Sequence, residues 1–194
     1  MSNITKREST RTLVLGAILT GLVFLLQMLG SFIHIGPFSI SLVLVPIVIG
    51  AATCNWKISA WLGTVFGIAV LVSGDAASFL AIDVAGTVVT VLLKGMLCGL
   101  VAGLVYKLLE KKNRYLAVVA SAIVCPIVNT GVFLLGCLVF FLPTVASWGA
   151  AEGYQNVAAY MFLGLAGGNF LVELLINIIL SPVIVRILNI RKKA

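Results

Sequence analysis

The sequence predicts an all-α integral membrane protein, a single bundle of six transmembrane helices spanning residues 1–194. Its residues are 61% hydrophobic and only 10% charged, and its mean hydropathy is +1.20. Soluble domains carry about 25% charged residues. Every lysine and arginine except Lys94 falls in short runs between apolar stretches, whereas the opposite loops hold Asp75, Asp83 and Glu152. Short loops rich in Lys and Arg stay in the cytoplasm, so both termini are predicted to lie there.

The first three helices follow one another with short connections. The first, residues 12–33, comes after a basic segment and reaches the length of about 20 apolar residues that a span requires. It is too long for the apolar region of a signal peptide, and we expect it to be retained. The turn at 34–37 leads to a short second helix, 38–54, and the third helix covers 58–73.

The remaining three helices are longer. The fourth, residues 84–108, ends in a strongly basic segment. The fifth, 115–142, contains Pro126, which predicts a kink. A polar and aromatic loop at 143–156 precedes the sixth helix, 157–188. Six crossings after a basic N-terminus return the C-terminus to the cytoplasm.

Polar side chains share one face within each of several predicted helices. The sets are Thr87, Thr90 and Lys94; Asn129 and Thr130; and Asn169, Glu173 and Asn177. A charge at the bilayer centre costs about 3 kcal/mol or more, so Lys94 and Glu173 should face the interior and pair. The pair has two interpretations that are compatible with each other. In one interpretation the pair locks the fourth helix to the sixth. In the other it belongs to a polar pocket for a small solute.

Small residues at four-residue spacing predict close contacts between helices. The sets are Ala17 and Gly21; Gly16 and Thr20; Gly63 and Gly67; Gly95, Gly99 and Gly103; and Gly164 and Gly168. Most of them are expected to pack inside the bundle. The stripe in the first helix lies near the cytoplasmic end, where it is a candidate docking site for a partner protein.

Several function classes find no support in the sequence. His34 has no partner ligands at short spacing and the cysteines show no C-x-x-C motif, so we expect no metal and no cofactor. No P-loop or catalytic motif is present, so we expect no enzyme and no ATP hydrolysis by this chain. The net charge of +7 comes from residues at helix ends, which argues against nucleic-acid binding.

A length of 194 residues, six helices with both termini inside and no ATPase motif resemble the substrate-binding S component of energy-coupling factor (ECF) transporters. Residues 34–39 and 44–51 are similar to that family's first outer loop and second helix. Residues 60–67 are similar to its third helix, and the spacing of Asn169 and Glu173 suits its sixth.

The resemblance implies a binding site toward the outer side, built from the fourth to sixth helices and capped by the first outer loop. The candidate substrate-binding residues are Lys94, Thr90, Asn129, Asn169 and Glu173, with Phe38 in the cap and Phe38, Phe133 and Trp148 available to stack on a ring. The family carries an A-x-x-x-A pair in its first helix that contacts a transmembrane coupling subunit. The matching positions here are Ala17 and Gly21.

By this resemblance the chain binds a water-soluble vitamin at a bacterial plasma membrane, and two cytoplasmic ATPase subunits on a shared coupling subunit drive uptake. Candidate vitamins are pantothenate, riboflavin and folate, and Lys94 favours one with a carboxylate. The alternative is a stand-alone, proton-coupled secondary transporter of a small solute that uses Lys94 and Glu173. An embedded enzyme and a scaffold without a ligand are further alternatives.

Overall fold

The computed structural model describes residues 2–31, 34–35, 38–39 and 42–193, and these are almost entirely helical. In chain order the elements are α1 (Ser2–Gly30), β1 (His34–Ile35), β2 (Phe38–Ser39), α2 (Leu44–Thr53), α3 (Trp56–Ser73), α4 (Ala77–Leu80), α5 (Val84–Leu109), α6 (Arg114–Phe140), α7 (Leu142–Ala151), α8 (Val157–Ala159), the π-helix η1 (Tyr160–Leu165) and α9 (Gly167–Lys193). The two short strands pair antiparallel. The predicted all-α class is therefore confirmed, with one small hairpin added.

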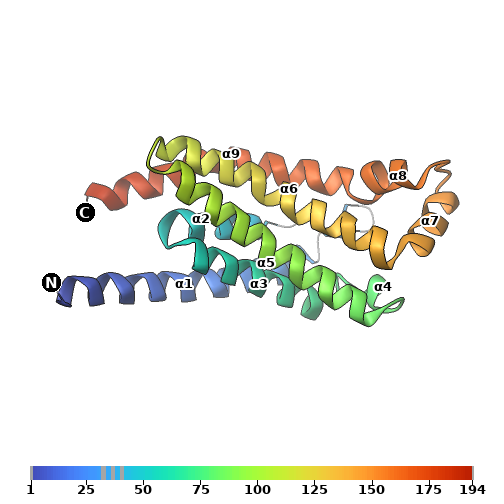
Figure 1. Cartoon of the computed structure of the whole chain (residues 1–194), viewed down its shortest axis with the longest axis horizontal. Coiled ribbons are helices and arrows are strands. Elements are labelled where there is room, and N and C mark those ends of the chain that lie inside the picture. Colours follow the sequence, from blue (N-terminus) through green and yellow to red (C-terminus); the bar gives the residue numbers. More distant parts are fainter. Residues whose placement is uncertain (1, 32–33, 36–37, 40–41, 194) are drawn as a thin grey trace.

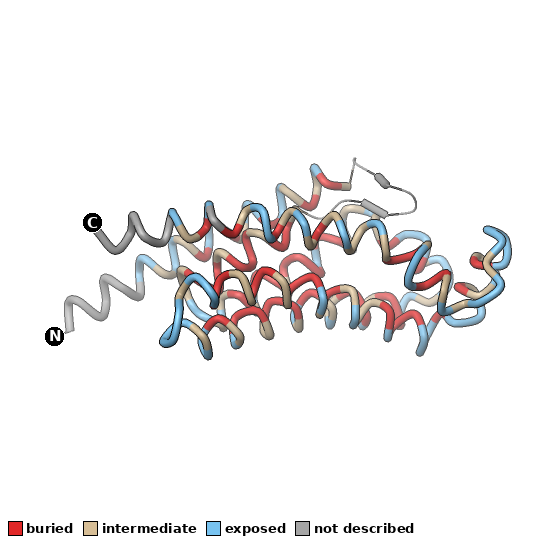
Figure 2. The backbone as a smooth tube through the Cα atoms, turned by 90° about the horizontal axis from the view of Figure 1, so that it is seen from above, coloured by how far each residue is buried: buried red, intermediate tan, exposed pale blue. Residues whose placement is uncertain are grey.

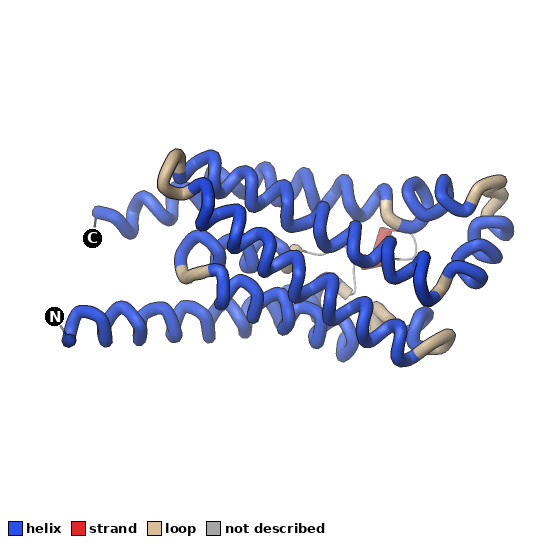
Figure 3. Tube along the Cα trace, viewed as in Figure 1, coloured by secondary structure: helices blue, strands red, loops and turns tan. Residues whose placement is uncertain are grey.

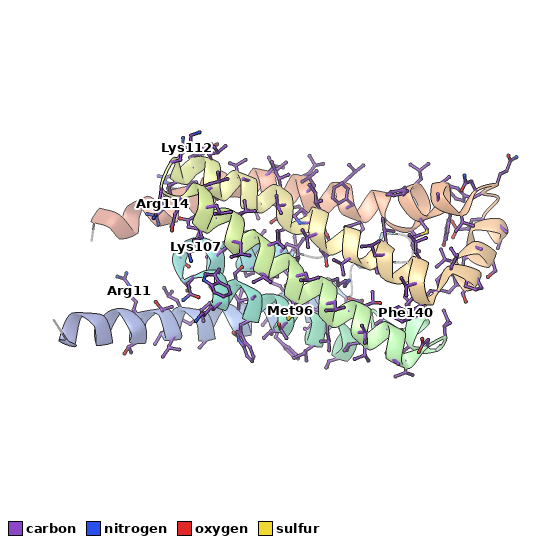
Figure 4. The ribbon with its side chains drawn as sticks, in the orientation of Figure 1. Arg11, Met96, Lys107, Lys112, Arg114 and Phe140 are labelled. Atoms are coloured by element: carbon purple, nitrogen blue, oxygen red, sulfur yellow. The ribbon has the colours of Figure 1, made fainter. Side chains whose placement is uncertain are left out.

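The long helices run roughly along one axis, and both ends of the chain lie at the same end of the bundle (Figure 1). We call this the terminal end, and it also holds the connection between α5 and α6 (Figures 1 and 3). The short helices α4, α7 and α8 lie at the opposite end, which we call the far end. Arg11, Lys107, Lys112 and Arg114 all lie toward the terminal end (Figure 4).

Within the described part of the chain, five helices are long and apolar enough to cross a membrane. They cover Thr10–Gly30, Trp56–Ser73, Val84–Leu109, Arg114–Phe140 and Gly167–Arg186. Exposed residues lie along the outside of the bundle, and buried residues face its interior (Figure 2). Many of the exposed side chains are large and apolar, including Leu13, Val72, Val139 and Leu163. Such a surface suits contact with lipid rather than water.

The predicted second span, 38–54, is not a continuous helix. Phe38–Ser39 forms a strand, and only Leu44–Thr53 is helical. Ten helical residues extend for about 15 Å, half of the roughly 30 Å of hydrocarbon in a bilayer. Most of α2 is buried, including Leu44, Ile47 and Val48 at 0% exposure. Its apolar character therefore reflects burial among the other helices.

The predicted bounds differ most at the ends of the chain and at the far end. α1 begins at Ser2 rather than at 12, because the polar residues before the apolar stretch continue the same helix. The predicted loop 143–156 is mostly the helix α7, with a proline in its first turn, where its missing N–H costs nothing. α6 runs from Arg114 to Phe140 through Pro126, as one helix.

The predicted sixth helix is interrupted between α8 and α9 by the π-helix η1. Three glycines lie in and just after this segment, and they favour departures from regular helix. A Cβ on Gly164 would lie 2.7 Å from the ring of Tyr160, whereas one on Gly168 would meet nothing within 4 Å. The predicted stripe of Gly164 and Gly168 is therefore not a contact surface between helices.

The small stripes of α3 and α5 pack inside the bundle, as predicted, and the structure shows that they face each other. They are Gly63 and Gly67 on α3, and Gly95, Gly99 and Gly103 on α5. A Cβ on Gly67 would lie 2.9 Å from the carbonyl oxygen of Val91, and one on Gly103 would lie 2.7 Å from Cα of Trp56. Only glycine allows the two backbones this close, so the stripes fix how α3 lies against α5.

Candidate functional site

A polar cavity lies in the half of the bundle toward the far end. It is lined by Gln27, Phe66, Val70, Asp75, Ala76, Phe79, Thr87, Thr90, Val91, Lys94, Asn129, Thr130, Phe133, Phe141, Leu165, Ala166, Asn169 and Glu173. These residues come from α1, α3, α4, α5, α6, η1 and α9 and from the segments that connect them. Its empty volume is about 790 Å³ including the part open to solvent, so this is an upper bound on the space for a ligand.

Glu173 forms the polar centre of one wall. Its side chain is 1% exposed, and its two carboxylate oxygens accept hydrogen bonds from two amides. Asn169 Nδ2, one helical turn earlier on α9, donates to Oε1 at 3.2 Å. Asn129 Nδ2, on α6, donates to Oε2 at 3.5 Å. Burial of a carboxylate is costly without such partners, and both partners were among the predicted site residues.

Asn177 shares the α9 face with Glu173 but has a different role. Its Nδ2 donates to the backbone carbonyl of Glu173 at 2.8 Å, and its own backbone carbonyl accepts from Ser181 Oγ at 2.8 Å. Asn177 is 1% exposed and does not line the cavity. The polar face predicted on the sixth helix therefore divides into a cavity-lining part and a part that bonds within α9.

Lys94 lines the same cavity from α5, but it does not form the expected ion pair with Glu173. Its Nζ lies over two aromatic rings, 5.6 Å from the centroid of Phe66 and 5.4 Å from that of Phe133. In the described part of the chain, the carboxylate oxygens of Glu173 accept from the amides of Asn129 and Asn169 and form no ion pair with Lys94. Cation–π contacts stabilise the charge, yet they satisfy none of its three N–H donors. The interpretation that an ion pair between Lys94 and Glu173 locks two helices together is therefore not supported.

Three polar atoms of cavity-lining residues are buried without a hydrogen-bond partner in the described structure. They are Thr90 Oγ1, Asn129 Oδ1 and Asn169 Oδ1. More than about 90% of buried polar groups in proteins have a partner, so such atoms in one place need an explanation. A bound solute or ordered water that donates to them would provide it.

Gln27 and Asp75 also line the cavity, and the sequence analysis did not select them as site residues. Gln27 is 3% exposed, and its Nε2 donates to Asp75 Oδ2 and, at 3.3 Å, to Ser73 Oγ. The contact joins α1 to the segment after α3. Gln27 could have been selected from the sequence as a site residue, because its amide side chain lies inside an apolar stretch. Asp75 was interpreted only as a charge in an outer loop.

Aromatic side chains close the cavity toward the far end, with Phe79 of α4 at their centre. Its ring contacts Phe133, Phe141 and Trp148 edge-on, with centroids 5.6, 5.0 and 5.5 Å away. The first two of these line the cavity, but Trp148 does not. The prediction that Trp148 contacts a ligand is therefore not supported, because Trp148 packs behind Phe79. The side chain of Phe38 lies outside the described residues.

The small stripe on α1 faces outward. Ala17 and Gly21 are both exposed, and a Cβ added to Gly21 would meet nothing within 4 Å. Gly16 lies on the other side of α1, where a Cβ would be 3.4 Å from Ile58. Ala17 and Gly21 are therefore not used for packing in this chain, whereas Gly16 is.

Long apolar helices around a polar pocket define this chain as a multi-pass membrane protein. In the part of the chain that the structure describes, no three His, Cys, Asp or Glu side chains are grouped so as to hold a metal ion. The chain matches the family model described as "ECF transporter, substrate-specific component" over residues 11–185. This covers most of the chain, which therefore belongs to that family, as the sequence predicted. Comparisons with curated proteins and with solved structures find no match.

Proposed function

We propose that this chain is the substrate-binding subunit of an importer for a water-soluble vitamin, and that the cavity around Lys94 and Glu173 is its binding site. Membership of the substrate-specific family supports the first part. The observation that carries the second is the group of buried polar atoms without partners, on Thr90, Asn129 and Asn169. A site that recognises a polar solute needs such atoms, since they form their bonds only when the solute is bound.

In this proposal each polar residue has a role. Lys94 binds an acceptor of the vitamin, Asn129 and Asn169 hydrogen-bond its polar groups, and Glu173 orients the two amides. Phe79 covers the cavity at its far end, with Trp148 packed behind it. Pantothenate, riboflavin and folate are the starting candidates.

We further propose that both termini lie in the cytoplasm of a bacterial cell and that the cavity lies toward the outer side of the membrane. The gathering of Arg11, Lys107, Lys112 and Arg114 at the terminal end supports this orientation (Figure 4). The cavity lies in the other half of the bundle. The chain from the hairpin through α2 would provide the sixth crossing, with a helix that spans only part of the bilayer.

Transport requires partners in this proposal, namely a transmembrane coupling subunit and two cytoplasmic ATPases. The exposed stripe of Ala17 and Gly21 is the proposed contact with the coupling subunit. Small residues on the lipid-facing side of a helix permit close approach of another helix. The energy for uptake then comes from ATP hydrolysis by the partner subunits and not from this chain.

Two measurements test this function. Mass spectrometry of small molecules released from the purified protein should identify a bound vitamin or precursor. Proteoliposomes that contain this chain alone should bind the compound without accumulating it, and accumulation should begin when the coupling and ATPase subunits are added with ATP. Sustained uptake by the chain alone, driven by a proton gradient, would instead support the secondary transporter that uses Lys94 and Glu173.

A further inference from the structure

The amides beside Glu173 indicate which hydrogen-bonding groups the solute presents. A carboxylate accepts hydrogen bonds, so the amides of Asn129 and Asn169 must turn their NH₂ groups toward it, as they do. Each amide then has its carbonyl oxygen left over, and both of these oxygens are buried without a partner. On this wall the cavity therefore offers acceptors, namely two amide oxygens and the remaining lone pairs of Glu173. The complementary solute group carries several N–H or O–H donors.

The α5 wall has the opposite character. The Nζ of Lys94, which carries three N–H donors, lies over the rings of Phe66 and Phe133. Thr90, one turn earlier on α5, has a buried hydroxyl without a partner. A carbonyl, ring nitrogen or other acceptor on the solute would satisfy both side chains. The two walls are therefore distinct, since α6 and α9 carry amide oxygens without partners, whereas α5 carries the ammonium group of Lys94 and the hydroxyl of Thr90.

The charges that line the cavity favour a solute that is not an anion. The charged side chains among its lining residues are Lys94, Asp75 and Glu173, which at their usual charges leave one net negative charge. A solute with a lone carboxylate would add a second negative charge in surroundings of low polarity, where repulsion is strong. A neutral or cationic solute avoids this repulsion. Four phenylalanine rings in the lining also suit a flat ring system.

We propose that the solute is a nitrogen-rich heterocycle, neutral or cationic overall. Its edge of two or more N–H donors faces Asn129, Glu173 and Asn169, and an acceptor on the same molecule faces Lys94 and Thr90. This inference rests on the proposed function and narrows the substrate class, since it disfavours pantothenate, which is an anion without a nitrogen ring.

The test compares defined probes on the purified full-length chain by isothermal titration calorimetry. Thiamine is a cation with an aminopyrimidine edge, 2-amino-4-oxopteridine is neutral with several N–H donors, and pantothenate is the anionic control. We expect one of the two nitrogen heterocycles to bind at least about tenfold more tightly than pantothenate. Tightest binding by pantothenate would overturn the inference while it supported the proposed function.

A matched pair of variants on α9 tests the geometry. Asn169→Ala removes an unpartnered acceptor of the cavity, whereas Asn177→Ala removes a buried amide of the same helix that does not line it. We expect Asn169→Ala to weaken binding of the nitrogen heterocycle at least about tenfold and Asn177→Ala to change it less than about twofold. The melting temperature of each variant shows whether it is folded. Equal effects of the two variants would contradict the proposed contact.

The compound released from the purified protein gives a second readout. A released molecule with an N–H-rich ring edge supports the inference, and one without such an edge overturns it but leaves the proposed function intact. If no molecule is released and none of the three probes binds, both the inference and the proposed function fail.

Discussion

Asn129 provides the sharpest test of the binding site because it lines the cavity and one of its two polar atoms has no partner. Its Nδ2 donates to Glu173 Oε2 at 3.5 Å, which is long for an N–H···O bond, and its Oδ1 has no partner. The side chain is 6% exposed. Asn129→Ala should therefore leave the empty protein folded but remove an acceptor from a bound solute.

The size of the effect follows from the hydrogen bond that a solute would lose. A neutral hydrogen bond contributes about 1 kcal/mol net, and a donor left buried without a partner costs about 1–3 kcal/mol. Loss of affinity should therefore be at least about tenfold, or about 1.4 kcal/mol. An effect far above about a hundredfold would indicate that the fold had changed as well.

The assay is isothermal titration calorimetry with the compound identified by mass spectrometry, on the wild-type chain and the variant in the same detergent. Ser121→Ala is the matched control, because Ser121 is also a buried polar residue of α6. Its Oγ donates to the carbonyl of Ala102 at 2.9 Å, outside the cavity. It should lower the melting temperature slightly and leave affinity unchanged. Unchanged affinity in a folded Asn129→Ala protein would remove Asn129 from the site.

Two further predictions concern the helix surfaces. The double variant Ala17→Leu with Gly21→Leu should bind the solute normally but lose transport in the full complex, because the stripe is exposed in the chain itself; loss of binding in calorimetry would assign the stripe to internal packing. Gly67→Leu should sharply lower the melting temperature, since its Cβ would lie 2.9 Å from a carbonyl oxygen of α5, whereas Gly131→Leu, with nothing within 4 Å, should change it little. Similar melting temperatures for the two would refute the backbone approach of α3 and α5.

Much of the site could be predicted from the sequence because polar residues inside apolar helices are costly unless they face one another. That rule selected Lys94, Asn129 and Glu173 from three separate helices, and the structure brings them to one cavity. The rule does not say which atoms bond. Glu173 is bonded by amides, and Lys94 lies over aromatic rings.

The rule did not predict the contacts of residues whose place in the sequence indicated a different role. Asp75 seemed to be an ordinary loop charge, but Gln27 of α1 donates to it at the edge of the cavity. Trp148 seemed available to a solute, but it packs behind Phe79. In each case a neighbour distant in the sequence decides what the side chain contacts.

The sequence by itself determined the class of this protein. Hydropathy and the placement of basic residues depend on composition and order along the chain, which are local properties, and they suffice to predict a helical membrane bundle. The glycine stripes of α3 and α5 were readable for the same reason, since a helix places every fourth residue on one side.

Only the tertiary structure decided the length of α2, the interruption before α9 and the chemistry of the cavity. These depend on how α5, α6 and α9 converge, and helices far apart in the sequence set those distances. An apolar stretch has the same composition whether it crosses lipid or lies among other helices, so the sequence could not reveal that α2 is short and buried. The same convergence brings Lys94 and the unpartnered amide oxygens of Asn129 and Asn169 to one cavity, because only folding brings their helices together.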